Sequence, residues 1–148
     1  MKKSDRMIPI KQLAEDHEKE AVKDLGQAQR ALTEHEMKLE QLVSYRAEYY
    51  RMFQEHGSRG MDGSQLQAYQ SFLAQLDTAI VSQREMIEQV SVERDNRRDV
   101  WQHRHIRTEA LGKTVERYQN TEQRQEQSRE QREQDDHANN QFWLLHHK

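Results

Sequence analysis

The groups in this sequence that could do chemistry are histidines, carboxylates and glycines, and their spacing decides which of them form a site. The chain has eight histidines and no cysteine. His103 and His105 are two residues apart, so on a helix they point to different faces, and His146 and His147 are direct neighbours. Neither pair has a cysteine or a well-spaced carboxylate to complete a tetrahedral zinc site. We therefore favour histidines scattered over surface and core positions, and we expect no metal and no cofactor.

Carboxylates are abundant, with 26 aspartates and glutamates, but acid–base catalysis needs a cleft that shifts the pKa of one of them. A narrow helical rod has no such cleft. The glycines at positions 57, 60 and 63 lack the Gly-Lys-Ser/Thr ending of a phosphate-binding loop and follow no strand pattern. We expect no catalytic residue and no enzymatic activity.

Residues 94–107 are locally basic, with five arginines, two histidines and Trp101. Acidic residues are interspersed, which favours a solvated helix face; a contact surface for an acidic protein partner is the second interpretation. Nucleic acid is not expected, because the net charge is -3 and Trp101 falls in the predicted core stripe rather than on a surface where bases could stack.

The elements that position these groups are two segments whose apolar residues recur every three or four residues, which is typical of coiled-coil helices. The break between them, residues 56–64, holds three glycines, and glycines end helices. The stripe of the first segment reads Leu13, His17, Ala21, Leu25, Ala28, Leu32, His35, Leu39, Leu42, Arg46, Tyr49 and Phe53. The stripe of the second reads Tyr69, Leu73, Leu76, Ile80, Gln83, Ile87, Val90, Arg94, Arg97, Trp101, Arg104, Thr108, Leu111, Val115 and Tyr118.

The sequence therefore predicts an all-α fold: one coiled-coil domain over residues 1–148, formed by an antiparallel two-helix hairpin with a longer C-terminal arm. The expected parts are a first helix over about 9–55, a glycine-rich turn over 56–64, a second helix over about 65–135 and a polar tail to 148. Pro9 suits a first helical turn, with Ser4 and Asp5 as caps upstream, and Ser64 is the expected N-cap of the second helix. Folding back near residue 60 places Leu13 near Arg107 and leaves residues past about 112 without a partner in the hairpin.

The composition agrees with a thin pair of helices rather than a globule. Only 33% of the residues are hydrophobic and the mean hydropathy is -1.26, whereas a compact domain is about 45–50% apolar. No apolar run is long enough for a signal peptide or a membrane span. We expect a soluble, intracellular protein that does not insert into the membrane.

The flank of the stripe is the candidate site. With Leu25, Leu32 and Leu39 at heptad position a, position g holds Ala31, Lys38, Tyr45 and Met52 on the first segment and Phe72, Ala79 and Met86 on the second. All but Lys38 are apolar or aromatic, at a position where charged residues are usual. In an antiparallel pair the g edges of the two helices adjoin, which predicts an exposed apolar edge beside the turn, and exposed apolar patches of this kind favour partner binding over a widened core. The opposite edge, at e, is more polar, although Val43 and Tyr50 reduce the contrast. The apolar edge consists of Tyr45, Met52, Phe72, Ala79 and Met86.

The C-terminal part has two features of open interpretation. Residues 119–134 are of low complexity and contain no apolar residue; a solvated helix supported by Glu/Arg pairs and a frayed segment are both compatible with this pattern. Residues 142–145, Phe-Trp-Leu-Leu, form an isolated apolar cluster. It is either a docking peptide or a tail that packs on nothing.

Two segments carry a resemblance to a known family. Leu-Val-Ser-Tyr-Arg-Ala-Glu-Tyr at 42–49, the glycine-rich break, and Tyr-Gln-Ser-Phe-Leu-Ala-Gln-Leu-Asp-Thr-Ala-Ile-Val-Ser-Gln at 69–83 resemble the signature of the flagellar FliJ family. Length, two-arm architecture and turn position are also similar. The sequence departs from the family's pattern at Lys38 and Gln83, where some members carry Gln and His.

The resemblance implies a non-enzymatic component of the flagellar type III protein export apparatus, a stalk that links the export ATPase ring to the export gate. Its expected partners are the hexameric export ATPase, the cytoplasmic domain of the membrane export gate and export chaperones, which family members escort. The expected location is the cytoplasmic face of the inner membrane at the flagellar basal body. The gate-contacting positions of the family correspond to Leu42, Tyr45, Tyr49, Phe72, Leu76, Ala79 and Gln83. For the ATPase ring no sharp motif marks the contacts, and the helix-end residues considered are Leu13, His17, Trp101, Arg104, Leu111 and Val115.

Two alternatives remain open from the sequence. One is the equivalent stalk of a virulence type III secretion system, and the other is a generic coiled-coil scaffold.

Overall fold

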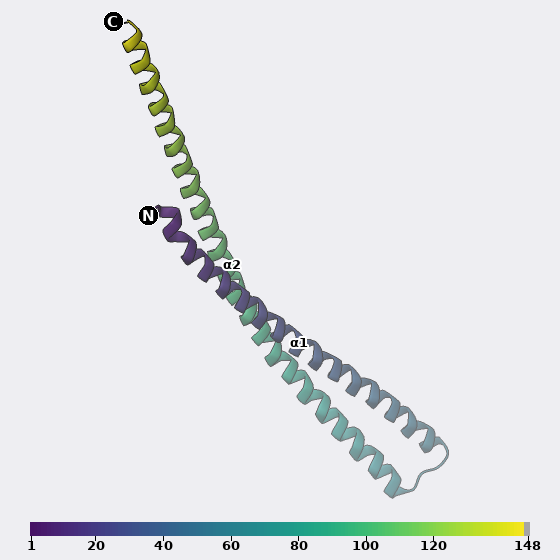
Figure 1. Cartoon of the computed structure of the whole chain (residues 1–148). Coiled ribbons are helices and arrows are strands. Elements are labelled where there is room, and N and C mark those ends of the chain that lie inside the picture. The colour runs from purple at the N-terminus through teal and green to yellow at the C-terminus, as the bar shows by residue number, and fades with distance from the viewer. Residues whose placement is uncertain (147–148) are drawn as a thin grey trace. The chain divides into compact units, whose positions relative to one another are not determined.

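Two long helices make up nearly all of the chain. The computed structural model describes residues 1–146, in which α1 spans Lys3–Ser58 and α2 spans Gly63–His146, with no strand in this range. The helices pack against each other in opposite directions and α2 is the longer one (Figure 1). The predicted fold class, an antiparallel two-helix hairpin with a longer C-terminal arm, is confirmed.

The contacts between α1 and α2 form two compact units. The first unit joins Met1–Lys19 to the part of α2 that starts at Gln102, and the second is Glu20–Trp101 with the turn. In the second unit the most buried apolar side chains are those of Ala21, Leu32, Leu76 and Ile80. All four belong to the predicted stripes, so in this unit the heptad register predicts the core correctly.

In the first unit the predicted stripe of α1 was wrong at Leu13. Its side chain is 57% exposed, whereas Ala14 is 4% exposed and packs in the core. Heptad position a, counted back from Leu25, falls on Glu18 and Lys11, which are both half-buried. Position d, counted back from Ala21, falls on Ala14. The stripe thus continues in strict register with small and polar residues, and the apolar nature of Leu13 does not bring it into the core. Thr108 donates a hydrogen bond to the Ala14 carbonyl at 3.3 Å, one residue on from the predicted pairing of Leu13 with Arg107.

The predicted start of the first helix was also wrong, because α1 begins at Lys3 and carries Pro9 in its interior. Pro9 has no N–H, so α1 lacks one backbone hydrogen bond near its start and continues past it. Ser4 is not a cap: it is buried, its amide donates to Glu122 Oε1 at 3.1 Å and its hydroxyl donates to Oε2 at 2.6 Å. The Glu122 carboxylate thereby satisfies a free amide of the first turn, where a negative charge is favourable.

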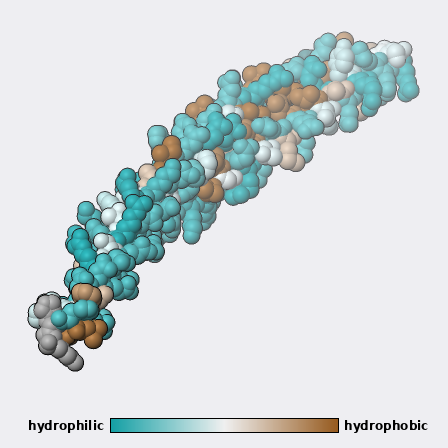
Figure 2. Space-filling view, turned by 90° about the horizontal axis from the view of Figure 1, so that it is seen from above, coloured by the Kyte–Doolittle hydropathy of each residue, from teal (hydrophilic) through white to brown (hydrophobic). Residues whose placement is uncertain are grey.

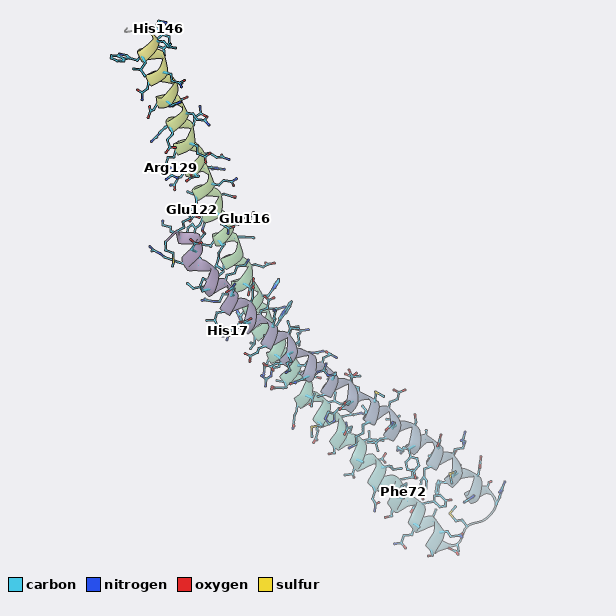
Figure 3. The ribbon with its side chains drawn as sticks, in the orientation of Figure 1. His17, Phe72, Glu116, Glu122, Arg129 and His146 are labelled. Atoms are coloured by element: carbon cyan, nitrogen blue, oxygen red, sulfur yellow. The ribbon has the colours of Figure 1, made fainter. Side chains whose placement is uncertain are left out.

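The longer α1 extends the pairing along α2. Glu122 lies beside the first turn of α1 (Figure 3), and the Lys3 ammonium lies 5.6 Å from the centre of the Tyr118 ring. The prediction that residues past about 112 lack a partner was therefore wrong. The hydrogen bonds from Ser4 also hold the pKa of the Glu122 carboxyl below its ordinary value.

The turn is shorter than predicted and covers only residues 59–62. Gly60, with φ at 92°, is the one residue with positive φ in the described chain, and it ends α1. The N-cap of α2 is Asp62 rather than Ser64, since its carboxylate accepts a hydrogen bond from the Gln65 amide at 2.8 Å. Gly57 and Gly63 lie within helices. Of the three glycines, only Gly60 has a backbone conformation that favours glycine over other residues.

The polar tail predicted after residue 135 is helical, because α2 continues to His146 (Figure 3). Gln, Glu and Arg are good helix formers, and Arg129 donates to both carboxylate oxygens of Glu126 at 2.7 Å. At the end of α2 the Phe142 ring stacks on His146 at 4.1 Å. The apolar side chains at 142–145 are all well exposed, and His147 lies outside the described residues.

We predict opposite effects for alanine at two glycines of the turn region. Gly60→Ala should lower the free energy of unfolding by about 1–2 kcal/mol, because an L-residue is strained at positive φ. Gly57→Ala should raise it by up to about 1 kcal/mol, since Gly57 is helical and an added Cβ would meet no atom within 4 Å. Urea unfolding followed by circular dichroism measures both changes. Equal effects of the two substitutions would contradict the assignment of the turn to Gly60.

Candidate partner-binding site

Aromatic rings from both helices form a continuous cluster beside the turn. The Tyr49 ring lies 4.4 Å from Phe72 and 5.1 Å from Tyr69, measured between centroids. Phe53 lies 5.6 Å from Tyr69, and the Tyr69 hydroxyl pairs with His56 Nδ1 at 2.6 Å. Each aromatic pair contributes about 0.5–1.5 kcal/mol beyond the area that it buries. The cluster therefore fixes the two helices relative to each other within the second unit.

Tyr45 stands at the outer side of this cluster. Its ring meets Phe72 edge-on, with 6.0 Å between centroids and an angle of 87°, while half of its surface stays exposed. The predicted adjacency of the two g edges is thus seen in the contact between Tyr45 and Phe72. Phe72 comes from α2 at the level of the C-terminal part of α1 (Figure 3).

The apolar edge combines exposed and half-buried side chains. Tyr45, Met52 and Met86 are 50%, 44% and 41% exposed, whereas Phe72 and Ala79 are half-buried. Figure 2 shows hydrophobic side chains gathered on the visible surface of the hairpin. A partner that meets this edge would find Tyr45 and the two methionines first, and methionine suits such surfaces because its side chain adapts its shape.

The other predicted gate-contacting residues lie deeper. Leu42 and Tyr49 are half-buried between the helices, and Leu76 and Gln83 are 7% and 6% exposed. These last two residues face the core, because they occupy the stripe itself and not its flank. Of the seven predicted positions, the structure brings Tyr45, Tyr49 and Phe72 into ring contact and leaves Tyr45 the most accessible.

Gln83 joins the two helices through a polar contact inside the core. Its side-chain amide donates to the His35 carbonyl at 2.9 Å and lies 3.0 Å from His35 Nδ1. His35 is therefore a hydrogen-bonded core histidine, as the sequence predicted. A buried polar pair in a coiled coil fixes register, since any shift of the helices leaves its groups unpaired.

A shallow groove runs along α1 next to Tyr45, and the sequence did not indicate it. The side chains that line it come from the outer face of α1 at steps of one, three and four residues: Met37, Glu40, Gln41, Ser44, Tyr45 and Glu48. The groove extends from Tyr45, on the apolar edge, to Glu40 and Glu48 on the outer face of α1. The sequence feature that could have revealed the groove is Met37, an apolar residue among polar neighbours, whose side chain is exposed in the structure.

An ion pair joins the two helices at the opposite edge, at heptad position e of the hairpin. The Arg46 guanidinium donates to both carboxylate oxygens of Asp77, and this hydrogen bonding raises the pKa of Arg46. Tyr50 and Val43 are exposed on this side, and the Arg46 guanidinium lies 5.9 Å from the centre of the Tyr50 ring. The e edge therefore exposes side chains to a similar extent as the apolar edge, but it carries an ion pair between the helices.

The six residues considered for an ATPase ring differ in exposure and are divided between the two units. Trp101 is half-buried and belongs to the second unit, whereas the other five belong to the first. Val115 is 5% exposed, His17 and Leu111 are half-buried, and Leu13 and Arg104 are exposed. Contact of these residues with an ATPase stays a prediction.

His105 contacts two glutamates in the first unit. Its Nδ1 lies 2.7 Å from a Glu18 carboxylate oxygen and its Nε2 lies 3.2 Å from Glu109. The hydrogen bond to Glu18 raises the pKa of His105, and the same hydrogen bond lowers the pKa of Glu18. The sequence reading missed this pair, because Glu18 belongs to the stripe only when the heptads are counted back from Leu25.

No group of three or more His, Asp or Glu side chains in residues 1–146 could hold a metal ion, and no large side chain in this range is fully enclosed. No helix in the same range is both long and apolar enough to cross a membrane.

Two paired helices with heptad cores and an apolar flank define an antiparallel coiled-coil hairpin. The family model described as flagellar FliJ protein matches residues 2–144, so the chain belongs to this family. The family is a non-catalytic component of flagellar export, and the chain is accordingly a flagellar export-related protein. No curated protein and no solved structure matched the chain.

Loss of the Gln83 side chain should destabilise the hairpin. Gln83→Ala is expected to cost about 1–3 kcal/mol of unfolding free energy, because it opens a space in the core and removes the hydrogen bonds to His35. The double variant His35→Leu/Gln83→Leu should recover most of this loss with an apolar pair, as measured by urea unfolding. A Gln83→Ala chain of unchanged stability that fails to bind a partner would instead identify Gln83 as a surface contact.

The contact between His105 and Glu18 predicts a pH dependence. Since the pKa of His105 is raised by folding, its contribution is complete below the unfolded value of about 6.5 and is lost as the pH rises through the higher folded value. Because the pKa of Glu18 is lowered, its contribution is present above its unfolded value and is lost on acidification. Between pH 6 and pH 8 the melting temperature should therefore fall.

A matched pair of variants tests this dependence. His105→Gln should flatten the fall between pH 6 and pH 8, whereas His103→Gln, at an exposed neighbouring position, should leave it unchanged. A fall that persists in full in His105→Gln would assign the dependence to other groups.

Proposed function

We propose that this chain is the non-enzymatic stalk of the flagellar type III export apparatus, which links the export ATPase ring to the export gate and escorts export chaperones. The observation that carries the proposal is the family match over residues 2–144. The two-helix hairpin supports it, because a pair of long helices can connect two partners through separate surfaces. The proposed location is the cytoplasmic face of the inner membrane at the flagellar basal body.

The apolar edge is the proposed contact for the cytoplasmic domain of the gate. Tyr45 supports this role, since its ring is half-exposed and is held in place by Phe72 and Tyr49. A large aromatic side chain that is already ordered loses little entropy on binding, and such residues often dominate interface energies. Leu76 and Gln83 support the edge from below.

The first unit is the proposed contact for the ATPase ring. Leu13 and Arg104 are exposed there, and α2 continues well beyond the contact of Glu122 with the start of α1. The exposed apolar residues 142–145 on this extension favour the docking interpretation over a bare tail. Chaperone escort follows from family membership alone, and the flagellar family match favours this apparatus over a virulence secretion system.

Two tyrosines on opposite edges provide the test. Tyr45→Ala should weaken binding to the purified cytoplasmic domain of the export gate at least about tenfold, or about 1.4 kcal/mol, because it removes an ordered ring from the contact. Tyr50→Ala removes an equally large ring of similar exposure, 42%, from the e edge and should change the affinity less than about threefold. Isothermal titration calorimetry measures both.

Circular dichroism separates this effect from unfolding, and both variants should keep the helicity of the parent chain. Equal weakening by Tyr45→Ala and Tyr50→Ala, or no binding of the parent chain to the gate domain, would contradict the proposed role of the apolar edge.

A further inference from the structure

Glutamates border the apolar edge along α1. Heptad position c adjoins position g on the outer side of a helix, and on α1 it is occupied by Glu34, Gln41, Glu48 and Glu55. Glu48 lines the groove beside Tyr45 together with Glu40. The three glutamates at c and Glu40 are exposed, and within residues 1–146 none of their carboxylates forms an ion pair. Their charge is therefore available to a partner.

The border on α2 is neutral. The corresponding c positions are occupied by Ala68, Gln75, Ser82 and Gln89, all exposed. Three basic residues lie near the groove: Arg46 is already engaged by Asp77, Arg51 lies on the outer face of α1, and Lys38 occupies position g in the row of the edge itself. The apolar edge thus has an acidic side on α1 and a neutral side on α2, and with Lys38 included the glutamates still leave its charge negative on balance.

This charge pattern discriminates between possible occupants. A second copy of the chain would bring glutamates against glutamates, and like charges across an interface cost free energy. An acidic partner segment meets the same repulsion. A segment with lysines or arginines beside its apolar residues pairs these with Glu40 and Glu48 while its apolar side chains cover Tyr45, Met52 and Met86.

The length of the edge indicates a helical segment. Phe72 and Met86 are separated by fourteen residues on α2, which corresponds to about 21 Å at 1.5 Å per residue. An amphipathic helix of about four turns, with apolar residues at steps of three and four, matches this length and the spacing of the edge.

We propose that the apolar edge and the adjoining groove of α1 bind a basic amphipathic helix, whose apolar stripe covers Tyr45, Met52 and Met86 and whose lysines or arginines pair with Glu40 and Glu48. This inference rests on the proposed gate-binding role of the edge and specifies the chemistry of the gate segment that it receives. Arginine or lysine in that segment would steer the association and select the orientation of the helix.

Two synthetic peptides test the charge of the occupant on the full chain. Both carry leucines at positions i, i+3, i+7, i+10 and i+14 of a helix; one has lysines and the other glutamates beside the leucines. Fluorescence anisotropy at low salt should show at least about tenfold tighter binding of the lysine peptide, and the difference should shrink at high salt because exposed charges are screened. Equal affinity of the two peptides, or tighter binding of the glutamate peptide, overturns the proposal.

Variants of the chain assign the effect to the groove. Glu40→Gln/Glu48→Gln should remove most of the preference for the lysine peptide, while Glu36→Gln/Glu88→Gln removes two exposed carboxylates elsewhere and should leave it unchanged. Tyr45→Ala should weaken both peptides. Equal effects of the two double variants would show non-specific attraction and overturn the proposal.

The purified gate domain separates this inference from the proposed function. If the gate domain binds in a Tyr45-dependent manner but Glu40→Gln/Glu48→Gln leaves its affinity unchanged, the gate-binding role stands and the basic-helix inference fails. If the lysine peptide binds as expected and the gate domain does not bind, the gate assignment fails while the chemistry of the edge stands. Sedimentation of the parent chain as a dimer that Tyr45→Ala makes monomeric would identify a second copy as the occupant and overturn the inference.

Discussion

Two helices can bury only the stripe that each turns toward the other, and this constraint shapes the rest of the molecule. The stripe must hold the hairpin together with few apolar residues, so aromatic contacts beside the turn and a polar contact between Gln83 and His35 supply what a larger core would provide. Residues on the flank of the stripe cannot be covered within the pair. Tyr45, Met52 and Met86 remain exposed for this reason.

The fold could be predicted from the sequence because heptad spacing and a glycine-rich break leave few alternatives. The errors have physical causes. Leu13 was placed in the core for its apolar side chain, although the register requires Ala14 there. Three glycines mark a turn without showing that Gly60 alone adopts positive φ. The extent of α2 was underestimated because a helix of Gln, Glu and Arg carries no apolar stripe by which its end could be recognised.

The candidate site was predicted in part. The adjacency of Tyr45 and Phe72 follows from the meeting of g positions in an antiparallel pair, and the ring contact agrees with it. The depth of each side chain does not follow from heptad position alone, since Leu76 and Gln83 are enclosed while Tyr45 is half-exposed. The groove on α1 was missed because its lining comes from outer-face positions that are polar in most coiled coils.

The two units divide the chemistry of the chain. The second unit holds the apolar edge, its glutamate border and the turn, whereas the first holds the hydrogen bonds of Ser4 to Glu122 and the contact of His105 with Glu18. In this member of the flagellar FliJ family the two units therefore differ in character, apolar and acidic in the second and rich in hydrogen-bonded polar side chains in the first.

The proposed contact of the apolar edge with the export gate can be followed directly through methionine methyl groups. The chain has six methionines, of which Met52 and Met86 lie on the edge and Met7 lies in the first unit. In a chain labelled with ¹³C at the methionine methyl groups, addition of the gate's cytoplasmic domain should shift the NMR signals of Met52 and Met86 and leave that of Met7 in place. A shift of Met7 with Met52 and Met86 unchanged would contradict the account.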